Sequence, residues 1–185
     1  MSHLCDFEGC PDAMCLMNDD PLFSYCCIFF LSSHTFFRGL VLFRVFRQEG
    51  RDDKMLQGGK EMMSDMGYWA NNSMAVFENK WLLLRAEHAA SINNHDEAKG
   101  LYKASIGAAR DHGNIHEMAL AYELFGNHHD ACGRSDDAKS CFSKACVAYK
   151  TWGATAIAER LYAKHDLDLS TADTGISAMK RERVE

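Results

Sequence analysis

The chain has 185 residues, a formal net charge of −6 and an apolar content of 47%. This length supports one hydrophobic core of ordinary domain size rather than two. The acidic balance argues against nucleic acid as a partner, because nucleic-acid-binding surfaces are usually basic and no basic stripe is present. Only two prolines occur, so most of the chain is free to form helices.

The first residues predict an irregular leader without a secretory signal, because acids are present and no basic n-region precedes an apolar run. Cys5, Cys10 and Cys15 recur there at five-residue steps. Such steps are unusual for a structural zinc site, which favours closer ligand pairs. A metal- or redox-responsive site built from these cysteines and His3 remains one hypothesis.

An apolar run at residues 22–31 is followed by polar residues, among them His34 and Arg38, before it reaches the roughly 20 residues that a membrane span needs. Apolar residues then continue at three- and four-residue steps to Phe46. This spacing predicts a helix with one face for the core. We therefore expect a buried helix here rather than a membrane anchor.

A second helix is expected after a polar break, with Asp52 or Asp53 as its N-cap and its end near Trp69. The residues Gly58-Gly59-Lys60 within it do not match a phosphate-binding loop, because the earlier glycine and the following Ser or Thr are missing. No cofactor is predicted.

The rest of the chain is punctuated at a fixed interval. Asn93, Gly113, Gly133 and Gly153 stand 20 residues apart, each where an amphipathic run stops. Glycine and asparagine accept the left-handed conformation found just past the last turn of a helix. The spacing predicts helices of equal length joined by tight turns, in a stacked array of helical hairpins.

Residues 40 apart correspond in type, which indicates a duplicated hairpin. Tyr102 corresponds to Phe142, and the small residues Ala86 and Gly126 correspond across the preceding helices. Small residues at that position let two helix backbones approach closely, and the aromatic rings fill the space beside them. Further matched pairs are Ala98 with Ala138, Lys99 with Lys139 and His88 with His128.

Two helix starts complete the predicted array. Asn114 followed three residues later by Glu117 resembles a capping box. A last helix, at about 154–165, would cover the open end of the stack. The polar composition beyond Leu167 predicts a disordered tail over 167–185.

The same alignment predicts the environment of three cysteines. Each takes the place of an aliphatic residue in the earlier unit: Cys132 that of Ile92, Cys141 that of Leu101 and Cys146 that of Ile106. We therefore expect all three to be small hydrophobic core residues. Because disulfide frameworks belong mostly to smaller secreted domains, a reducing, cytoplasmic location is predicted.

Histidines offer the remaining candidate chemistry. His112 and His116 are four apart, but a predicted helix stop separates them, so their rings need not converge. His128 and His129 point in different directions on a helix, although with Cys132 they could form a weak site. The favoured interpretation is histidines on the repeat surface. No catalytic constellation is recognisable, so the chain is not expected to be an enzyme.

The pattern Ala98-x3-Tyr102 with Ala138-x3-Phe142 resembles the tetratricopeptide repeat, although the offset of 40 differs from its usual 34. Six segments resemble the helical-repeat C-terminal part of a multidomain family of kinase-like signalling proteins with an AAA-type ATPase module and GAF sensors. They are PhePheArgGlyLeu at 36–40, PheGluAsnLys at 77–80, LeuLeuArgAlaGlu at 83–87, AlaLysGlyLeuTyr at 98–102, HisGluMetAlaLeuAlaTyrGluLeu at 116–124 and AlaTyrLysThrTrpGlyAlaThrAla at 148–156. Kinase, ATPase and GAF sequences are absent here, so the resemblance implies no catalysis.

The predicted fold is all-α, a right-handed superhelix of stacked helical hairpins, with a leader at 1–30, a repeat domain at 31–166 and the tail. Its predicted function is a non-catalytic protein-interaction scaffold in signalling. The first helix of each hairpin would line a concave surface that binds a protein or peptide. The residues expected there are Lys80, Leu83, Glu87, Leu120, Glu123, Asn127 and Asp130.

Three acids against one lysine on that surface suit a neutral or basic partner segment. A second hypothesis is that the chain is a fragment or regulatory C-terminal part of a multidomain kinase or ATPase signalling protein. In that case it would bind a signalling kinase or ATPase. The third hypothesis is the metal- or redox-responsive leader.

Overall fold

The computed structural model describes residues 21–48 and 50–167, which form seven consecutive helices. They are α2 (Pro21–Gln48), α3 (Asp53–Asn72), α4 (Met74–Ser91), α5 (His95–Asp111), α6 (Ile115–Ala131), α7 (Ser135–Trp152) and α8 (Thr155–His165). No strand occurs in these two ranges. The all-α array predicted from the sequence is therefore confirmed for the described chain.

The predicted domain limits fall partly outside the described residues. Residues 1–20, with their three evenly spaced cysteines, and residues 168–185 lie there. The predicted boundary at residue 30 lies inside α2, because that helix already begins at Pro21.

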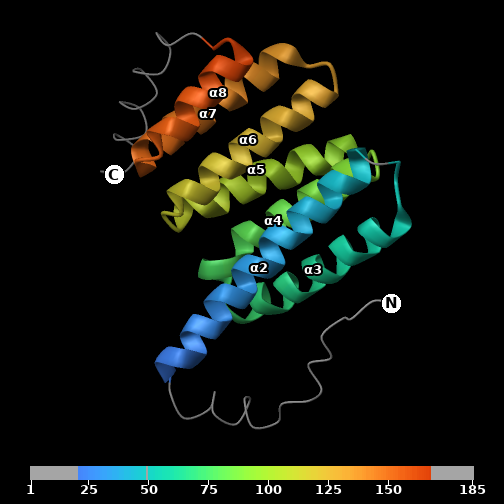
Figure 1. The fold of residues 1–185 in the computed structure, drawn as a ribbon, viewed down its shortest axis with the longest axis vertical. Coiled ribbons are helices and arrows are strands. Elements are labelled where there is room, and N and C mark those ends of the chain that lie inside the picture. The colour runs from blue at the N-terminus through green and yellow to red at the C-terminus, as the bar shows by residue number, and fades with distance from the viewer. Residues whose placement is uncertain (1–20, 49, 168–185) are drawn as a thin grey trace.

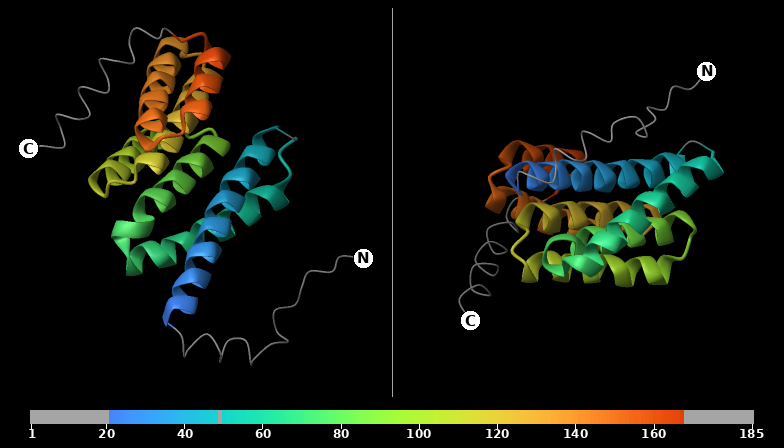
Figure 2. Two further views of the ribbon diagram at one scale, coloured as in Figure 1. Left: turned by 60° about the vertical axis from the view of Figure 1, so that its left-hand side comes forward. Right: turned by 90° about the horizontal axis from the view of Figure 1, so that it is seen from below.

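The helices pack as successive hairpins. Helices α2 and α3, α4 and α5, and α6 and α7 form three hairpins, and α8 packs on α7. The hairpins follow one another from the α2–α3 end to the α7–α8 end (Figure 1, Figure 2). Two views show the beginning of α2 reaching beyond α3 and α4 (Figure 1, Figure 2). Helix α2 also packs on α4, so it joins its own hairpin to the next one.

The four evenly spaced stops end their helices as predicted. Asn93, Gly113, Gly133 and Gly153 have φ angles of 61°, 71°, 71° and 101°, all in the left-handed region. After each stop, the next backbone N–H donates to the carbonyl five residues earlier at 2.8 to 2.9 Å. This bond satisfies a carbonyl that would otherwise be orphaned at the helix end. The four turns are therefore copies of one geometry.

Helix starts agree with the sequence at one site and differ at another. Asp52 is the N-cap of α3, and its Oδ1 accepts a hydrogen bond from the N–H of Lys54 at 2.9 Å. The predicted capping box at Asn114 is wrong, because Asn114 makes no side-chain cap bond. The carboxylate of Glu117 instead lies inside the array, where it accepts a hydrogen bond from Asn79 and forms an ion pair with Lys80.

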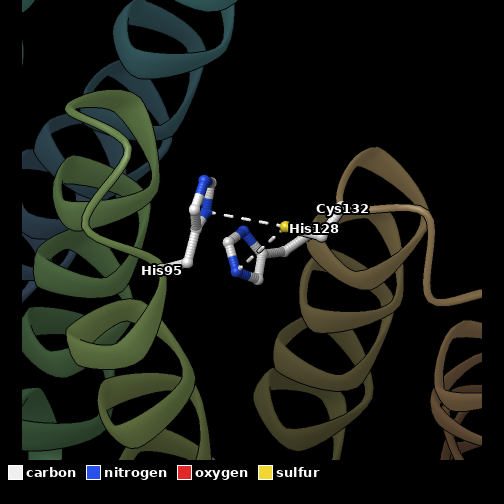
Figure 3. Close-up of side chains that lie close together, drawn as sticks. All are labelled: His95, His128 and Cys132. Carbon is white, nitrogen blue, oxygen red and sulfur yellow. Dashed lines mark hydrogen bonds between the residues drawn. The ribbon is translucent and has the colours of Figure 1, made fainter.

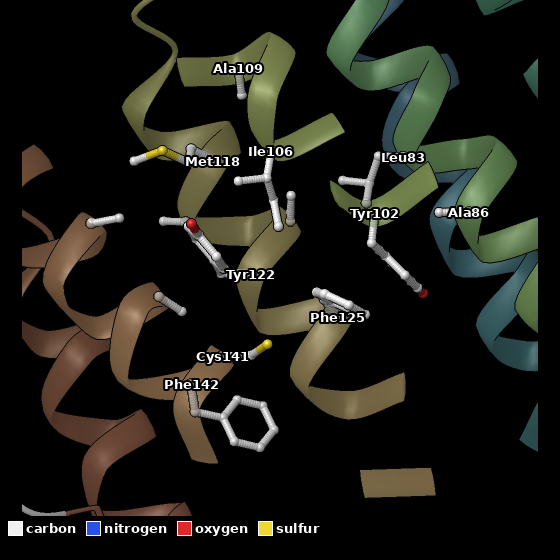
Figure 4. Packing of buried hydrophobic residues seen from close by; sticks show 14 of the residues in the cluster. Leu83, Ala86, Tyr102, Ile106, Ala109, Met118, Tyr122, Phe125, Cys141 and Phe142 are labelled. Atoms are coloured by element: carbon white, nitrogen blue, oxygen red, sulfur yellow. The ribbon is translucent and has the colours of Figure 1, made fainter. Parts of the chain in front are cut away.

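The core repeats as the alignment predicts. Tyr102 and Phe142 are both buried, and Tyr102 lies beside Ala86, the small residue expected of its unit (Figure 4). Phe142 lies against Gly126, the equivalent small residue. A Cβ atom added to Gly126 would lie 2.5 Å from Cε1 of Phe142, so only glycine leaves room for this ring. The ring of Tyr102 stacks on Phe125 with centroids 5.1 Å apart, which joins the two units.

The cysteine prediction is confirmed at two of three positions. Cys141 and Cys146 are buried in the core. Cys132 is only partly buried, and its equivalent Ile92 is itself 47% exposed. The prediction was wrong here because positions 92 and 132 follow the last residue of their helices, where the side chain is no longer held against the core.

Helix α2 is a core helix on one face. Phe36, Phe43 and Phe46 are buried, and Gly59 of α3 lets the ring of Phe43 approach the α3 backbone. Residues Phe29–Gln48 are long and apolar enough to cross a membrane by length and composition, but 33% of that stretch is buried against the rest of the chain. A core helix of a globular protein passes the same test.

Candidate functional site

The α4 part of the predicted concave surface is largely enclosed within the array. Leu83 is 1% exposed and Glu87 is 2% exposed. Lys80 is also engaged, because its Nζ lies 2.6 Å from Oε1 of Glu117. Leu83 and Glu87 are therefore buried inside the chain, and Lys80 is paired within it, because neighbouring helices pack where the period of α4 alone left a side open.

Glu87 lies at the centre of a buried polar cluster. Its Oε2 accepts a hydrogen bond from Nη2 of Arg47 at 2.5 Å, and its Oε1 accepts one from the hydroxyl of Tyr102. The other guanidinium nitrogen, Nη1, donates to the Glu87 carbonyl and to Oγ of Ser91, both at 3.1 Å. Burial, together with the adjacent Glu87, raises the pKa of Tyr102 well above its usual value. The cluster therefore joins the base Arg47 of α2, the acid Glu87 of α4 and the neutral donor Tyr102 of α5, and it serves the fold.

The α6 part of the predicted surface is less covered. Leu120 is half-buried against the core, and Glu123 accepts a hydrogen bond from the hydroxyl of Tyr149 at 2.8 Å. Asn127 and Asp130 are exposed. The predicted surface is thus reduced to α6, where its accessible part is short and acidic.

A larger exposed apolar surface lies on α2. Phe30, Phe37 and Val41 are 72%, 56% and 57% exposed. The steps of seven and four residues between them place the three side chains on one side of the helix. Phe36 and Phe43 lie on the opposite side, in the core. We call the outward side, defined by Phe30, Phe37 and Val41, the α2 face.

Charge on the α2 face is of one sign. The charges are those of Arg38 and Arg44, which are exposed beside its apolar residues together with the polar His34. The whole of α2 contains no Asp or Glu. Further exposed apolar residues lie on α3 and α4, at the end of the array near the start of α2: they are Tyr68, Met74 and Val76. Apart from Ile92 and Trp152, the large apolar residues exposed in the described ranges belong to α2, α3 and α4.

A second cluster brings together two histidines and a cysteine. Nδ1 of His95 lies 3.5 Å from Sγ of Cys132, and Nε2 of His128 lies 3.8 Å from the same sulfur (Figure 3). One ligand atom from each residue lies within 4.8 Å of the other two. His128 and Cys132 come from the last turn of α6 and its cap, and His95 is the first residue of α5. We call these three residues the His-His-Cys cluster.

The environment favours neutral imidazole in this cluster. Burial of His128, with a smaller contribution from the neighbouring His95, lowers its pKa to about 4. The ring is therefore uncharged at pH 7, and one of its nitrogens keeps a free lone pair. His128 with Cys132 was recognisable in the sequence from their spacing, but His95 was not, because it comes from the other hairpin.

His112, His116 and His129 do not converge, as the sequence suggested, but His129 is buried, whereas the sequence favoured a surface position. His112 lies 3.7 Å from Glu78, whereas His116 stacks on Trp152 with ring centroids 5.1 Å apart. His129 is buried against the ring of Phe125. These three residues have different neighbours and form no common site.

Comparison with known proteins adds no relative: no family model, curated protein or solved structure matches the chain.

Alkylation is expected to distinguish the three cysteines of the repeat. Burial raises the pKa of Cys146 to about 11, and burial likewise raises the pKa of Cys141. A raised pKa leaves little reactive thiolate at pH 8, about one Cys146 thiol in a thousand. With a metal chelator present, iodoacetamide should therefore modify Cys132 first, as measured by mass spectrometry of its peptide. Equal rates at Cys132 and Cys146 would contradict the burial described here.

Proposed function

We propose that the chain is a non-catalytic protein-binding module, a helical-hairpin array that docks a partner protein through the α2 face. The observation that carries the proposal is the stripe of Phe30, Phe37 and Val41, each more than half exposed on a helix whose opposite side is core. Exposed apolar patches of this kind mark interaction sites, because covering them removes apolar surface from water.

Charge narrows the class of partner. The exposed His34, Arg38 and Arg44, on a helix without acids, favour a partner with acidic residues beside its own apolar stripe. An amphipathic helix fits this description, since it could lie along α2 with apolar anchors at three- and four-residue steps. The proposed partner segment is therefore an apolar helix flanked by Asp or Glu.

The resemblance to the tetratricopeptide repeat is part of this proposal. The matched turns and the matched Tyr102 and Phe142 support a tetratricopeptide-like duplication. We also propose a right-handed superhelix, a cytoplasmic location and a signalling kinase or ATPase as partner. These proposals rest on the six segments that resemble the repeat region of kinase-like signalling proteins. The acidic surface at Asn127 and Asp130 is a second, smaller docking surface, suited to a basic segment.

A binding experiment with designed peptides tests the proposal. Two helical peptides share one leucine stripe and carry either Glu or Lys on the flanks, and each is titrated into the full chain. We expect the Glu peptide to bind more tightly. Phe37→Ser should weaken its binding by about tenfold, because a half-exposed phenylalanine contributes roughly 1.5 kcal/mol when a partner covers it.

Ile92→Ser is the matched control, because Ile92 is similarly exposed but lies outside the α2 face. It should leave peptide affinity unchanged. Preference for the Lys peptide, or equal loss in both variants, would contradict the proposal. Binding to anionic lipid vesicles that is stronger than binding to the Glu peptide would assign the α2 face to a membrane surface instead.

A further inference from the structure

We propose that His95, His128 and Cys132 bind one Zn²⁺ ion across the boundary between the α4–α5 and α6–α7 hairpins. The sequence offered His128 and His129 with Cys132 as a weak site, but it did not include His95. The ligand atoms of His95, His128 and Cys132 converge from two separate hairpins (Figure 3).

The distances suit a tetrahedral ion. With bonds of about 2.3 Å to sulfur and about 2.05 Å to nitrogen, a tetrahedral zinc site separates S from N by about 3.6 Å. The observed separations from Sγ of Cys132 are 3.5 Å to His95 and 3.8 Å to His128. The ligand nitrogens of the two histidines lie within 4.8 Å of each other, against about 3.3 Å in a tetrahedral site, so a rotation of the exposed His95 side chain would complete the geometry.

The backbone presents two of the ligands in a favourable arrangement. His128 and Cys132 are four residues apart, so their side chains lie one above the other on the same side of α6. His128 is buried, which fixes its ring, and that ring also lies against Tyr102 with centroids 5.5 Å apart. His95 is exposed and Cys132 is partly exposed, so an ion can reach the cluster from solvent.

The donor atoms select the class of metal. Two imidazole nitrogens and one thiolate suit Zn²⁺, whereas Mg²⁺ and Ca²⁺ prefer oxygen ligands. Three protein ligands leave a fourth coordination position on the exposed side of the cluster. Water or a donor atom from a bound protein would fill that position.

The cluster is not a consequence of the repeat. The equivalent of Cys132 in the earlier unit is Ile92, and the equivalent of His95 in the later unit is Ser135. His88, the equivalent of His128, packs on the ring of Phe43 instead. The chain therefore supplies its own conservative substitutions, Cys132→Ile and His95→Ser.

Bound zinc would cross-link α5 and α6, the two helices that meet at the boundary between the hairpins. The contact between α5 and α6 is less extensive than the contacts within either flanking hairpin. An ion held by both helices would stiffen this boundary and stabilise the native state, by an amount that rises with the logarithm of its concentration once that exceeds Kd. This consequence concerns the shape of the array and does not depend on the α2 face.

The test uses the full chain, stripped with a chelator under reducing conditions. Zn²⁺ is titrated against a chromophoric chelator, and Co²⁺ is titrated with absorption spectroscopy. We expect one ion per chain, a thiolate-to-cobalt charge-transfer band, and visible bands of tetrahedral intensity. His95→Ser and Cys132→Ile should each weaken binding by more than roughly a hundredfold, the upper end of what losing a mere supporting residue costs.

Two controls isolate the site. A full-length Cys5→Ser/Cys10→Ser/Cys15→Ser variant should keep the ion, and so should His116→Ser, which removes an exposed histidine from elsewhere. Circular dichroism checks that every variant is folded. His95 is exposed, so His95→Ser should fold and still measure the loss of zinc affinity if Cys132→Ile unfolds. Unchanged affinity in folded His95→Ser overturns the proposal, as does loss of the ion in the triple cysteine variant.

Discussion

Glu87→Ala is expected to lower the free energy of unfolding by about 3 kcal/mol, because it leaves a buried hydroxyl and a partly buried guanidinium without their acceptor. Glu87 is 2% exposed and accepts hydrogen bonds from Arg47 and Tyr102. The side chain of Arg47 is 31% exposed, so water recovers part of its lost interaction. The expected value therefore lies at the low end of the range for a broken buried pair. Urea unfolding followed by circular dichroism measures it.

Two control variants separate the cluster from general effects. Tyr102→Phe removes one donor but leaves the ion pair of Glu87 with Arg47, so a loss of about 1 kcal/mol is expected. Glu97→Ala removes an exposed acid from α5 and should change stability by less than about 0.5 kcal/mol. If Glu87→Ala proved no more destabilising than Glu97→Ala, the buried cluster would not hold α2 on α4.

Phe142→Ala is expected to destabilise the fold by about 4 kcal/mol, through lost burial and the cavity left behind. The ring is 1% exposed and lies against the bare backbone at Gly126. Because α6 and α7 make the most extensive helix pair of the array, little can move in to refill the space. Thermal and urea unfolding give the value.

Gly126 offers a sharper version of the same test. In the wild-type chain, Gly126→Ala places Cβ 2.5 Å from the ring, and the strain of about 1–3 kcal/mol outweighs a gain in helix propensity of about 1 kcal/mol. In the Phe142→Leu background the clash is relieved and only the gain remains. The substitution should therefore change sign, from destabilising to stabilising. The same sign in both backgrounds would contradict the close packing of α6 on α7.

The local features of the fold followed from the sequence. Evenly spaced Asn and Gly residues predicted four left-handed helix stops because this conformation depends on the residue and its immediate neighbours. The 40-residue alignment placed Tyr102 and Phe142 in equivalent core positions because a duplicated hairpin repeats its internal packing. Asp52 capped its helix for an equally local reason.

Long-range pairing did not follow from the sequence. Arg47 and Glu87 are 40 residues apart, and nothing in the period of either helix says that one packs on the other. Glu117 was therefore assigned to a helix cap, although Asn79 and Lys80 of another hairpin hold it. The same limit applies to the predicted partner surface, because its α4 residues Leu83 and Glu87 are buried by neighbouring helices that the register does not identify.

The His-His-Cys cluster combines a local sequence pattern with a long-range contact. The spacing of His128 and Cys132 is a local pattern, and the sequence already marked it as a weak site. His95 joins it only because α5 lies beside α6, and that contact depends on the stacking of two hairpins. The alignment also hid Cys132, because an aliphatic equivalent suggests a core position even where the residue lies beyond the end of its helix.

A photo-cross-linking measurement tests most directly whether the α2 face is the docking surface. Benzoylphenylalanine replaces Phe37 in one full-length variant, Leu120 in a second and Trp152 in a third, and each is irradiated with the Glu-flanked helical peptide. If the α2 face is the docking surface, position 37 should give a cross-link that excess unlabelled peptide abolishes. Positions 120 and 152 should give none. A cross-link from position 120 without one from 37 would contradict it and return the binding site to α6.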